Sequence, residues 1–112
     1  MRQAAWAIWL LSMAAVPGAA ADDKLATGKA IAFDRNKGNC LACHMMDDGE
    51  LPGNSAPPLL MMKARFPDRD VLRLQIWDAL TRNPNSVMPP YGRHRILTEE
   101  EIDLVVDYVH SL

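Results

Sequence analysis

The 112-residue sequence predicts a small all-α domain, on three observations. First, residues 98–109 combine a helix-capping sequence with apolar residues at helical spacing. Second, segments 24–34 and 71–80 carry weaker helical patterns, and no segment alternates apolar and polar residues as a half-buried strand does. Third, the connecting segments are rich in proline, glycine and asparagine, which favours loops. We therefore expect three to four helices joined by proline-rich loops.

The N-terminal residues 1–21 have the pattern of a secretory signal peptide. Arg2 is their only charge, residues 4–16 are apolar, and the alanines at 19–21 suit a cleavage site. The alternative is an uncleaved membrane anchor, but the apolar run is shorter than the roughly 20 residues that span a bilayer. We expect a mature domain of residues 22–112, exported to the periplasm after cleavage near Ala21.

The composition of residues 22–112 indicates one small domain without an affinity for nucleic acid. The net charge of the whole chain is −2, and lysines and arginines are scattered rather than clustered. A chain of this size has a thin core and usually needs an additional stabilising link.

The first expected helix, residues 24–34, follows two aspartates that favour its positive end. Gly28 is among the small residues on this segment that would let another helix approach closely. Residues 36–39 (Asn-Lys-Gly-Asn) then predict a turn.

Cys40-Leu41-Ala42-Cys43-His44 follows this turn and is the attachment pattern of c-type haem. Two thiols one helical turn apart can form thioethers to two vinyl groups on one porphyrin edge. The adjacent imidazole can then bind the iron. The sequence therefore predicts one haem c, attached through Cys40 and Cys43, with His44 as an iron ligand.

Other chemistries of the same residues fit the sequence less well. The two cysteines could form a disulfide beside an incidental His44. A thioredoxin-like redox pair belongs to a strand–turn–helix unit that the sequence does not show. Zinc would need about four ligands, and only three candidates lie nearby.

The segment 47–58 is rich in Gly, Pro, Asn and Ser and predicts an extended loop. A metal-binding imidazole usually donates its second N–H to an acceptor, and the carbonyl of Pro57 is a plausible one for His44. The alternative is a rigid loop without that contact. Three carboxylates at its start, Asp47, Asp48 and Glu50, are expected to be solvated rather than catalytic.

The segment 71–80 predicts the next helix, capped by Asp68 or Asp70 and ended by Asn83-Pro84, because a residue before proline avoids the α region. The last helix follows the capping box of Thr98 and Glu101.

A sixth iron ligand must come from the opposite face of the porphyrin. Met88 lies in a proline-rich loop that can hold a thioether at fixed reach with little entropy to lose. His94 and an open site remain alternatives, whereas His110 is expected only to complement the negative end of the last helix. Methionine opposite histidine raises the potential and favours electron transfer over oxygen chemistry. The candidates considered are Met45, Met46, Met61, Met62, Met88, His94 and His110.

Taken together, these features resemble a class I cytochrome c over nearly the whole predicted mature chain. The resemblance implies that the first and last helices cross, with Gly28 facing Tyr108 or a near neighbour. It also implies that Pro57 accepts the hydrogen bond of the proximal histidine and that Met88 is the axial ligand. Ala56 departs from the glycine that the family prefers there.

Three segments, 38–44, 88–92 and 97–102, together resemble the SoxX family, the small cytochrome subunits of the SoxAX complex in periplasmic sulfur oxidation. The similarity implies a SoxA-like haem-bearing partner and oxidative coupling of thiosulfate to the SoxYZ carrier, an L-cysteine S-thiosulfotransferase reaction. It further implies that this chain receives the electrons and passes them to a soluble cytochrome. We expect no catalysis by this chain alone.

Two other functions remain open at this point. One is a free-standing cytochrome that carries electrons to a terminal oxidase, and the other is a haem-free dithiol or structural domain. A permanent partner would need a larger and more apolar interface than a transient one. Trp77, Tyr91 and Ile96 could serve such an interface or the core.

Overall fold

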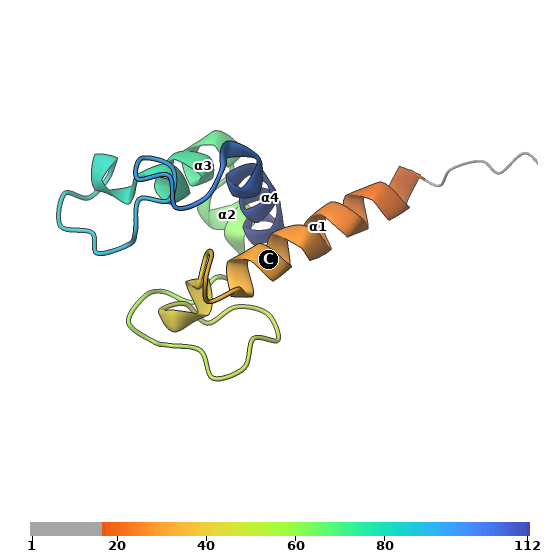
Figure 1. Ribbon diagram of the computed structural model, residues 1–112, viewed down its shortest axis with the longest axis horizontal. Coiled ribbons are helices and arrows are strands. Elements are labelled where there is room, and N and C mark those ends of the chain that lie inside the picture. The colour runs from red at the N-terminus through yellow and green to blue at the C-terminus, as the bar shows by residue number, and fades with distance from the viewer. Residues whose placement is uncertain (1–16) are drawn as a thin grey trace, which may run out of the picture.

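The computed structural model describes residues 17–112 and is helical, which confirms the predicted all-α class (Figure 1). Within these residues the strand-like pairing is limited to one isolated parallel bridge, between Met46 and Leu59. The elements, in chain order, are α1 (Pro17–Phe33), η1 (Cys40–Ala42), α2 (Met62–Arg65), α3 (Arg69–Trp77), η2 (Ala79–Thr81) and α4 (Glu99–His110).

Helix α1 already includes Pro17, the first described residue, seven residues before the predicted start at residue 24. Three of these seven residues, 19–21, are alanines, and alanine has the highest helix propensity of all residues. Most of the expected signal peptide, residues 1–16, lies outside the described residues, while residues 17–21 belong to α1.

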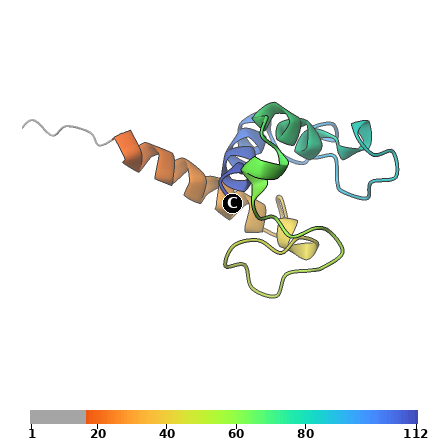
Figure 2. The ribbon, with the colours of Figure 1, turned by 180° about the vertical axis from the view of Figure 1, so that it is seen from behind.

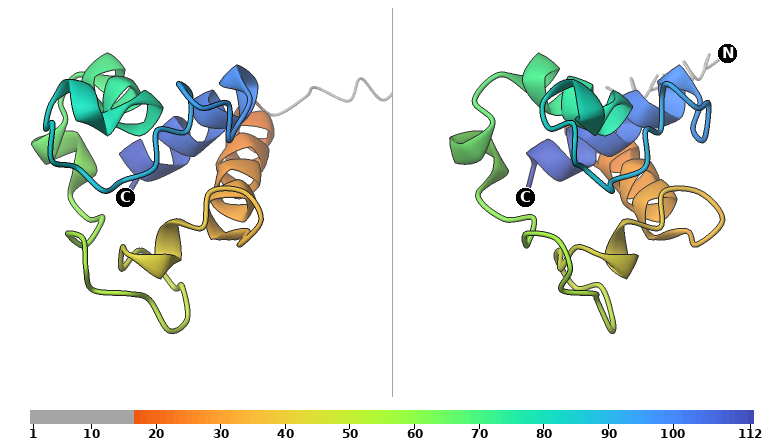
Figure 3. Two further views of the ribbon diagram at one scale, coloured as in Figure 1. Left: turned by 60° about the vertical axis from the view of Figure 1, so that its left-hand side comes forward. Right: turned by 90° about the vertical axis from the view of Figure 1, so that its left-hand side faces the viewer.

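Helices α1 and α4 cross closely, as Figures 1 and 3 show from different sides, and Gly28 lies at the contact. A Cβ atom at Gly28 would collide with the backbone carbonyl of Leu104 and would lie 2.9 Å from the Cβ of Tyr108. The expected contact of Gly28 with Tyr108 is therefore confirmed. The ring of Phe33 packs edge-on against that of Tyr108, with centroids 6.2 Å apart.

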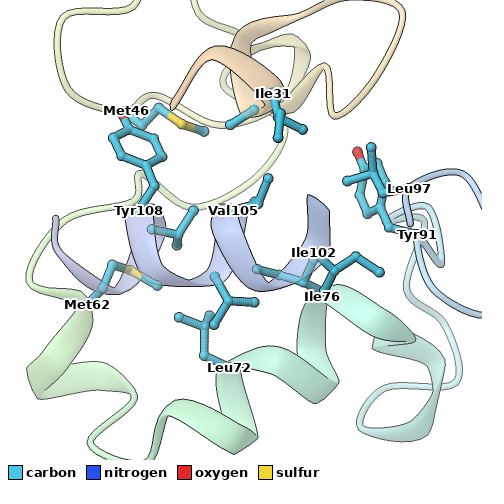
Figure 4. Close-up of a cluster of buried hydrophobic side chains, with 13 residues drawn as sticks. Ile31, Met46, Met62, Leu72, Ile76, Tyr91, Leu97, Ile102, Val105 and Tyr108 are labelled. Atoms are coloured by element: carbon cyan, nitrogen blue, oxygen red, sulfur yellow. The ribbon is translucent and has the colours of Figure 1, made fainter. Parts of the chain in front are cut away.

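Helix α4 lies at the centre of the core, and its start is the one predicted. The Thr98 hydroxyl accepts from the Glu101 N–H at 3.1 Å, and the Glu101 carboxylate accepts from the Thr98 N–H, which completes the capping box. Figure 4 shows that the core around α4 reaches Ile31 and Met46 on one side and Leu72 and Ile76 on the other. The buried residues of α4 are Ile102, Val105, Val106, Tyr108 and Val109.

The predicted helix 71–80 is instead two elements, α3 and η2, divided at Asp78. The Asp68 carboxylate caps α3 by accepting from the N–H of Asp70 at 2.9 Å. The buried Asp78 leaves helical geometry at φ −158°, and its carboxylate accepts from the N–H of Leu80 at 3.2 Å. The Asp78 side chain caps the following turn, η2, so α3 ends at Trp77 and not at Asn83-Pro84 as expected.

Two long connections extend from the helices, residues 43–61 between η1 and α2 and residues 82–98 between η2 and α4. Figure 2 shows them on different sides of the α4 crossing, with residues 43–61 passing beneath it. The predicted loop character of 47–58 is confirmed. Within residues 17–112, none of the helices has both the length and the apolar composition of a membrane span.

The three carboxylates at the start of the first loop are exposed, as expected, and two of them, Asp47 and Asp48, also form ion pairs. Lys29 of α1 forms ion pairs with Asp47 at 3.1 Å and with Asp48 at 2.6 Å, and the Tyr108 hydroxyl donates to Asp47 at 3.1 Å. Lys29 holds the pKa of the Asp47 carboxyl below its usual range. These contacts fasten the loop to the helix crossing.

Candidate haem site

The Cys-x-x-Cys-His segment forms a single 3₁₀ turn at the end of the predicted turn 36–39. Asn39 takes a left-handed conformation, φ 49°, which reverses the chain as it enters η1. The backbone N–H groups of Cys43 and His44 both donate to the Cys40 carbonyl, at 3.2 and 2.9 Å. One turn therefore presents two thiols and an imidazole, with Cys43 exposed and Cys40 half-buried.

His44 lies against the loop that contains Pro57, and the structure brings the two residues together. The Nδ1 atom of His44 donates to the Pro57 carbonyl at 2.7 Å. A carbonyl oxygen can only accept, so Nδ1 carries a proton, and in the neutral imidazole the lone pair then lies on Nε2. This is the tautomer that binds a metal through Nε2. Backbone bonds from Ala56 to Cys43 and from Leu59 to Met45 hold this part of the loop in place.

Two adjoining cavities open beside this turn. The first has a volume of about 250 Å³ and a mostly apolar lining, and the second has about 600 Å³. Their combined extent falls in the range of cofactor sites, roughly 300–1,000 Å³. The residues that line both cavities are Cys40, His44, Pro57, Gln75, Met88 and Tyr91.

Met88 lies in the wall of both cavities, on the second loop. Its N–H donates to the Ser86 hydroxyl at 3.2 Å, and its sulfur accepts from the Gln75 amide at 3.8 Å. His94 is exposed and lines neither cavity. His110 does more than face the solvent at a helix end, because its Nε2 lies 2.9 Å from the Phe66 carbonyl oxygen.

The other methionines are placed less favourably for a ligand. Met45 and Met61 are largely exposed, and Met46 is buried in the core. Met62 lines the smaller cavity but is fully buried, with its sulfur accepting from Arg65 at 3.4 Å. Among the candidates, the structure brings only Met88 together with His44 at both cavities.

The charged side chains in the two cavity linings are all positive, although Lys37 is also paired with Glu101 at 2.6 Å. Arg65 and Arg82 line the first cavity, and Arg35 and Lys37 line the second, whereas neither lining includes an aspartate or glutamate. Burial raises the pKa of the Cys40 thiol to about 11 and also raises the pKa of the Tyr91 hydroxyl. An apolar cavity with cationic residues at its walls fits haem, whose ring is apolar and whose propionates are anionic.

Sequence reasoning missed three residues of this site, Gln75, Arg65 and Arg82. The local sequence does not indicate a role at a cofactor site for any of them. Gln75 occupies a polar position in an amphipathic helix, and the two arginines have the pattern of ordinary solvated charges. Tyr91, considered for either the core or an interface, is buried and donates a hydrogen bond to the Gly38 carbonyl. Among the described residues, no group of three or more His, Cys, Asp and Glu side chains is arranged to hold a metal ion.

Comparison with known proteins identifies the family. A protein of Aquifex aeolicus (strain VF5) described as an uncharacterized lipoprotein is 36% identical over 76 residues, 67% of this chain, and the match covers 37% of that protein's length. Residues 23–109 match the family model described as cytochrome C oxidase, cbb3-type, subunit III. A cytochrome c domain implies haem c and an electron-transfer role. With this match over most of its length, the chain belongs to the cbb3-type cytochrome c oxidase subunit III family of cytochrome c domains.

Proposed function

We propose that this chain is a monohaem electron-transfer cytochrome, with haem attached through Cys40 and Cys43 and its iron bound by His44 and Met88. The observation that carries the proposal is that His44 and Met88 line the same two adjoining cavities beside the two cysteines. When bound there, haem c supplies a one-electron couple between ferrous and ferric iron.

The chain's own residues prepare the iron ligands. The Pro57 carbonyl keeps the proton of His44 on Nδ1, so that Nε2 presents its lone pair in a fixed direction. The second loop, stiffened by Pro89 and Pro90, presents the Met88 thioether with little entropy to lose. Two protein ligands would close the iron to small molecules, which supports electron transfer rather than oxygen chemistry.

Absorption spectroscopy of the protein matured in a host that attaches c-type haem tests this assignment. Ferric haem with a methionine ligand has a weak near-infrared charge-transfer band. We expect this band in the parent protein and its loss in Met88→Ala, with the haem still covalently bound. His94→Ala is the matched control and should keep the band. Loss of the band in His94→Ala instead, or no covalent haem at all, would overturn the assignment.

We propose that this chain is a free-standing electron carrier and that its electron acceptor is a terminal oxidase. The family description, which names a subunit of a cbb3-type oxidase, supports an oxidase as the acceptor. Val87, 95% exposed, and Ile96, 43% exposed, lie at the larger cavity and could form a small transient docking patch. Oxidation of the reduced protein by isolated cbb3-type oxidase, slowed in Val87→Asp, tests this step, and an equal rate in the variant would contradict it.

A second candidate is the small subunit of a SoxAX complex, with a SoxA-like partner and SoxYZ as carrier. The three segments that resemble SoxX meet at Tyr91, which lies in segment 88–92. Its hydroxyl donates to the Gly38 carbonyl of segment 38–44, and its carbonyl accepts from the Leu97 N–H of segment 97–102 at 3.1 Å. Co-expression with a SoxA-like cytochrome distinguishes the candidates. A stable heterodimer that survives gel filtration would favour SoxAX, and separate elution would favour the free carrier.

We also propose that the protein is exported to the periplasm and that residues 1–21 are removed. The pattern of one N-terminal charge, an apolar run and small residues supports this. The intact mass of the purified protein tests it, because cleavage near Ala21 leaves residues 22–112 plus one haem. A mass that includes residues 1–21 would contradict cleavage.

A further inference from the structure

Gln75 connects the sulfur of Met88 to a fixed cation. This residue lies on α3, lines both cavities, and donates from Nε2 to the Met88 sulfur at 3.8 Å. Its other amide atom, Oε1, accepts from Nη1 of Arg82 at 3.1 Å. The two ends of one amide thus contact a thioether on one side and a guanidinium on the other.

Arg82 determines which end of the amide faces the sulfur. A guanidinium has only donors, so it must take the amide oxygen of Gln75. That leaves the NH₂ group to face the thioether, whose lone pairs can only accept. Arg82 is itself held, because its guanidinium lies 5.2 Å from the centroid of the Phe66 ring in a cation–π contact.

We propose that Gln75 is a positioning residue that tunes the iron through Met88, with Arg82 fixing its amide; this inference rests on the proposed ligation by Met88. A thioether sulfur has two lone pairs, one for the metal and one for a hydrogen bond. Donation from Gln75 withdraws electron density from the sulfur, which makes it a weaker donor to ferric iron. A weaker donor favours the ferrous state, so the Gln75 hydrogen bond raises the reduction potential.

The test compares reduction potentials of the haem-loaded protein measured by spectroelectrochemistry. We expect Gln75→Leu to have a lower potential than the parent, with its near-infrared methionine band retained but shifted. Arg82→Leu should lower the potential by less, because the amide can still donate part of the time. Arg82→Lys should restore most of the loss, since an ammonium can also hold the amide oxygen.

Leu74, the neighbouring and 43% exposed residue of α3, lines neither cavity and offers a matched control. Leu74→Gln should keep the parent potential. The double change of Leu74→Gln with Gln75→Leu moves the amide by one position at constant composition, and it should behave like Gln75→Leu.

The outcomes separate this inference from the proposed function. If the parent lacks the methionine band, the ligation by Met88 fails. If the parent has the band but Gln75→Leu keeps its potential, Met88 remains the ligand and the role of Gln75 is overturned. A lower urea midpoint in Gln75→Leu with an unchanged potential would assign Gln75 a purely structural role and would also overturn the inference.

Discussion

Tyr91 links the loop that carries Met88 to the turn that precedes Cys40. Its ring is buried, and its hydroxyl donates to the carbonyl of Gly38, which is itself buried against α1. The contact joins residues that are 53 positions apart in the sequence. One side chain thereby fixes the second loop relative to the cysteine turn.

Replacing Tyr91 by phenylalanine should therefore destabilise the haem-loaded protein by about 1–3 kcal/mol. The change leaves the Gly38 carbonyl buried without its donor, and an unsatisfied buried acceptor costs about that much. Urea unfolding followed by circular dichroism measures the loss. Tyr108→Phe is the matched control, because its hydroxyl donates to the exposed carboxylate of Asp47, which water can solvate instead. An equal loss in both variants would contradict the argument.

At the scale of elements, the crossing of α1 and α4 depends on the missing side chain of Gly28. Gly28→Ala should cost about 1–3 kcal/mol, because the added methyl collides with the backbone of Leu104 and the helices must separate. The intrinsic preference of a helix for alanine, roughly 1 kcal/mol, would act in the opposite direction. Thermal unfolding of Gly28→Ala beside Ala26→Leu, an exposed site on the same helix, measures the effect. Stabilisation by Gly28→Ala would show that the helices do not meet there.

The contact between α3 and α4 is bordered by ion pairs. Arg73 donates to Asp103 at 2.7 Å, and Arg69 donates to Asp107 at 2.6 Å. Arg73, and then Arg69, hold the pKa of the Asp103 carboxyl below its usual range. A lowered folded-state pKa adds stability above the unfolded value, about 3.9, and this stability is lost as the pH falls through the folded pKa.

A double-mutant cycle of Asp103→Asn and Arg73→Gln should therefore show a coupling energy at pH 7 that disappears as the pH falls below the lowered pKa of Asp103. Because the pair is partly exposed, the coupling should be about 0.2–1 kcal/mol. Urea unfolding midpoints of the four proteins at several pH values give this energy. A coupling that persists or grows on acidification would have the wrong sign for an ionised Asp103.

The helices differ in how far local sequence determines them. Helix α4 could be predicted, because the capping box of Thr98 and Glu101 and the apolar spacing that follows act within the segment. The division at Asp78 could not, because it depends on burial of a carboxylate and on Arg93, 3.4 Å away and fifteen positions later. Helix α2 has four residues, too few to carry a helical period.

The same distinction applies to the candidate site. The cysteine turn and His44 are adjacent in sequence, so their chemistry can be predicted from the spacing alone. Met88 could be proposed from its proline-rich loop, but its neighbour Gln75 lies thirteen positions away and meets it only in the folded chain. Polar residues that act at a distance carry no local signal.

For the whole molecule, the cavities lie where the core would otherwise be continuous. Apolar residues of α3 and α4, among them Leu72 and Val105, belong both to the core and to the smaller cavity's lining. The haem would therefore complete the core as well as carry the electron. Stability and cofactor attachment are consequently coupled in this fold.

A chain that cannot attach haem should accordingly be unfolded. Without haem, the mostly apolar lining of the 250 Å³ cavity, which includes Leu72 and Val105, would face water instead of a packed partner, and a small domain has a typical stability of only about 5–15 kcal/mol. Cys40→Ser with Cys43→Ser removes both attachment points, and far-ultraviolet circular dichroism with proton NMR dispersion reports the fold. Met88→Ala keeps the covalent haem and should remain folded, which separates the filling of the core from iron ligation. A double-serine protein that unfolds cooperatively at the midpoint of the haem-loaded parent would show that the helices form a sufficient core without the cofactor.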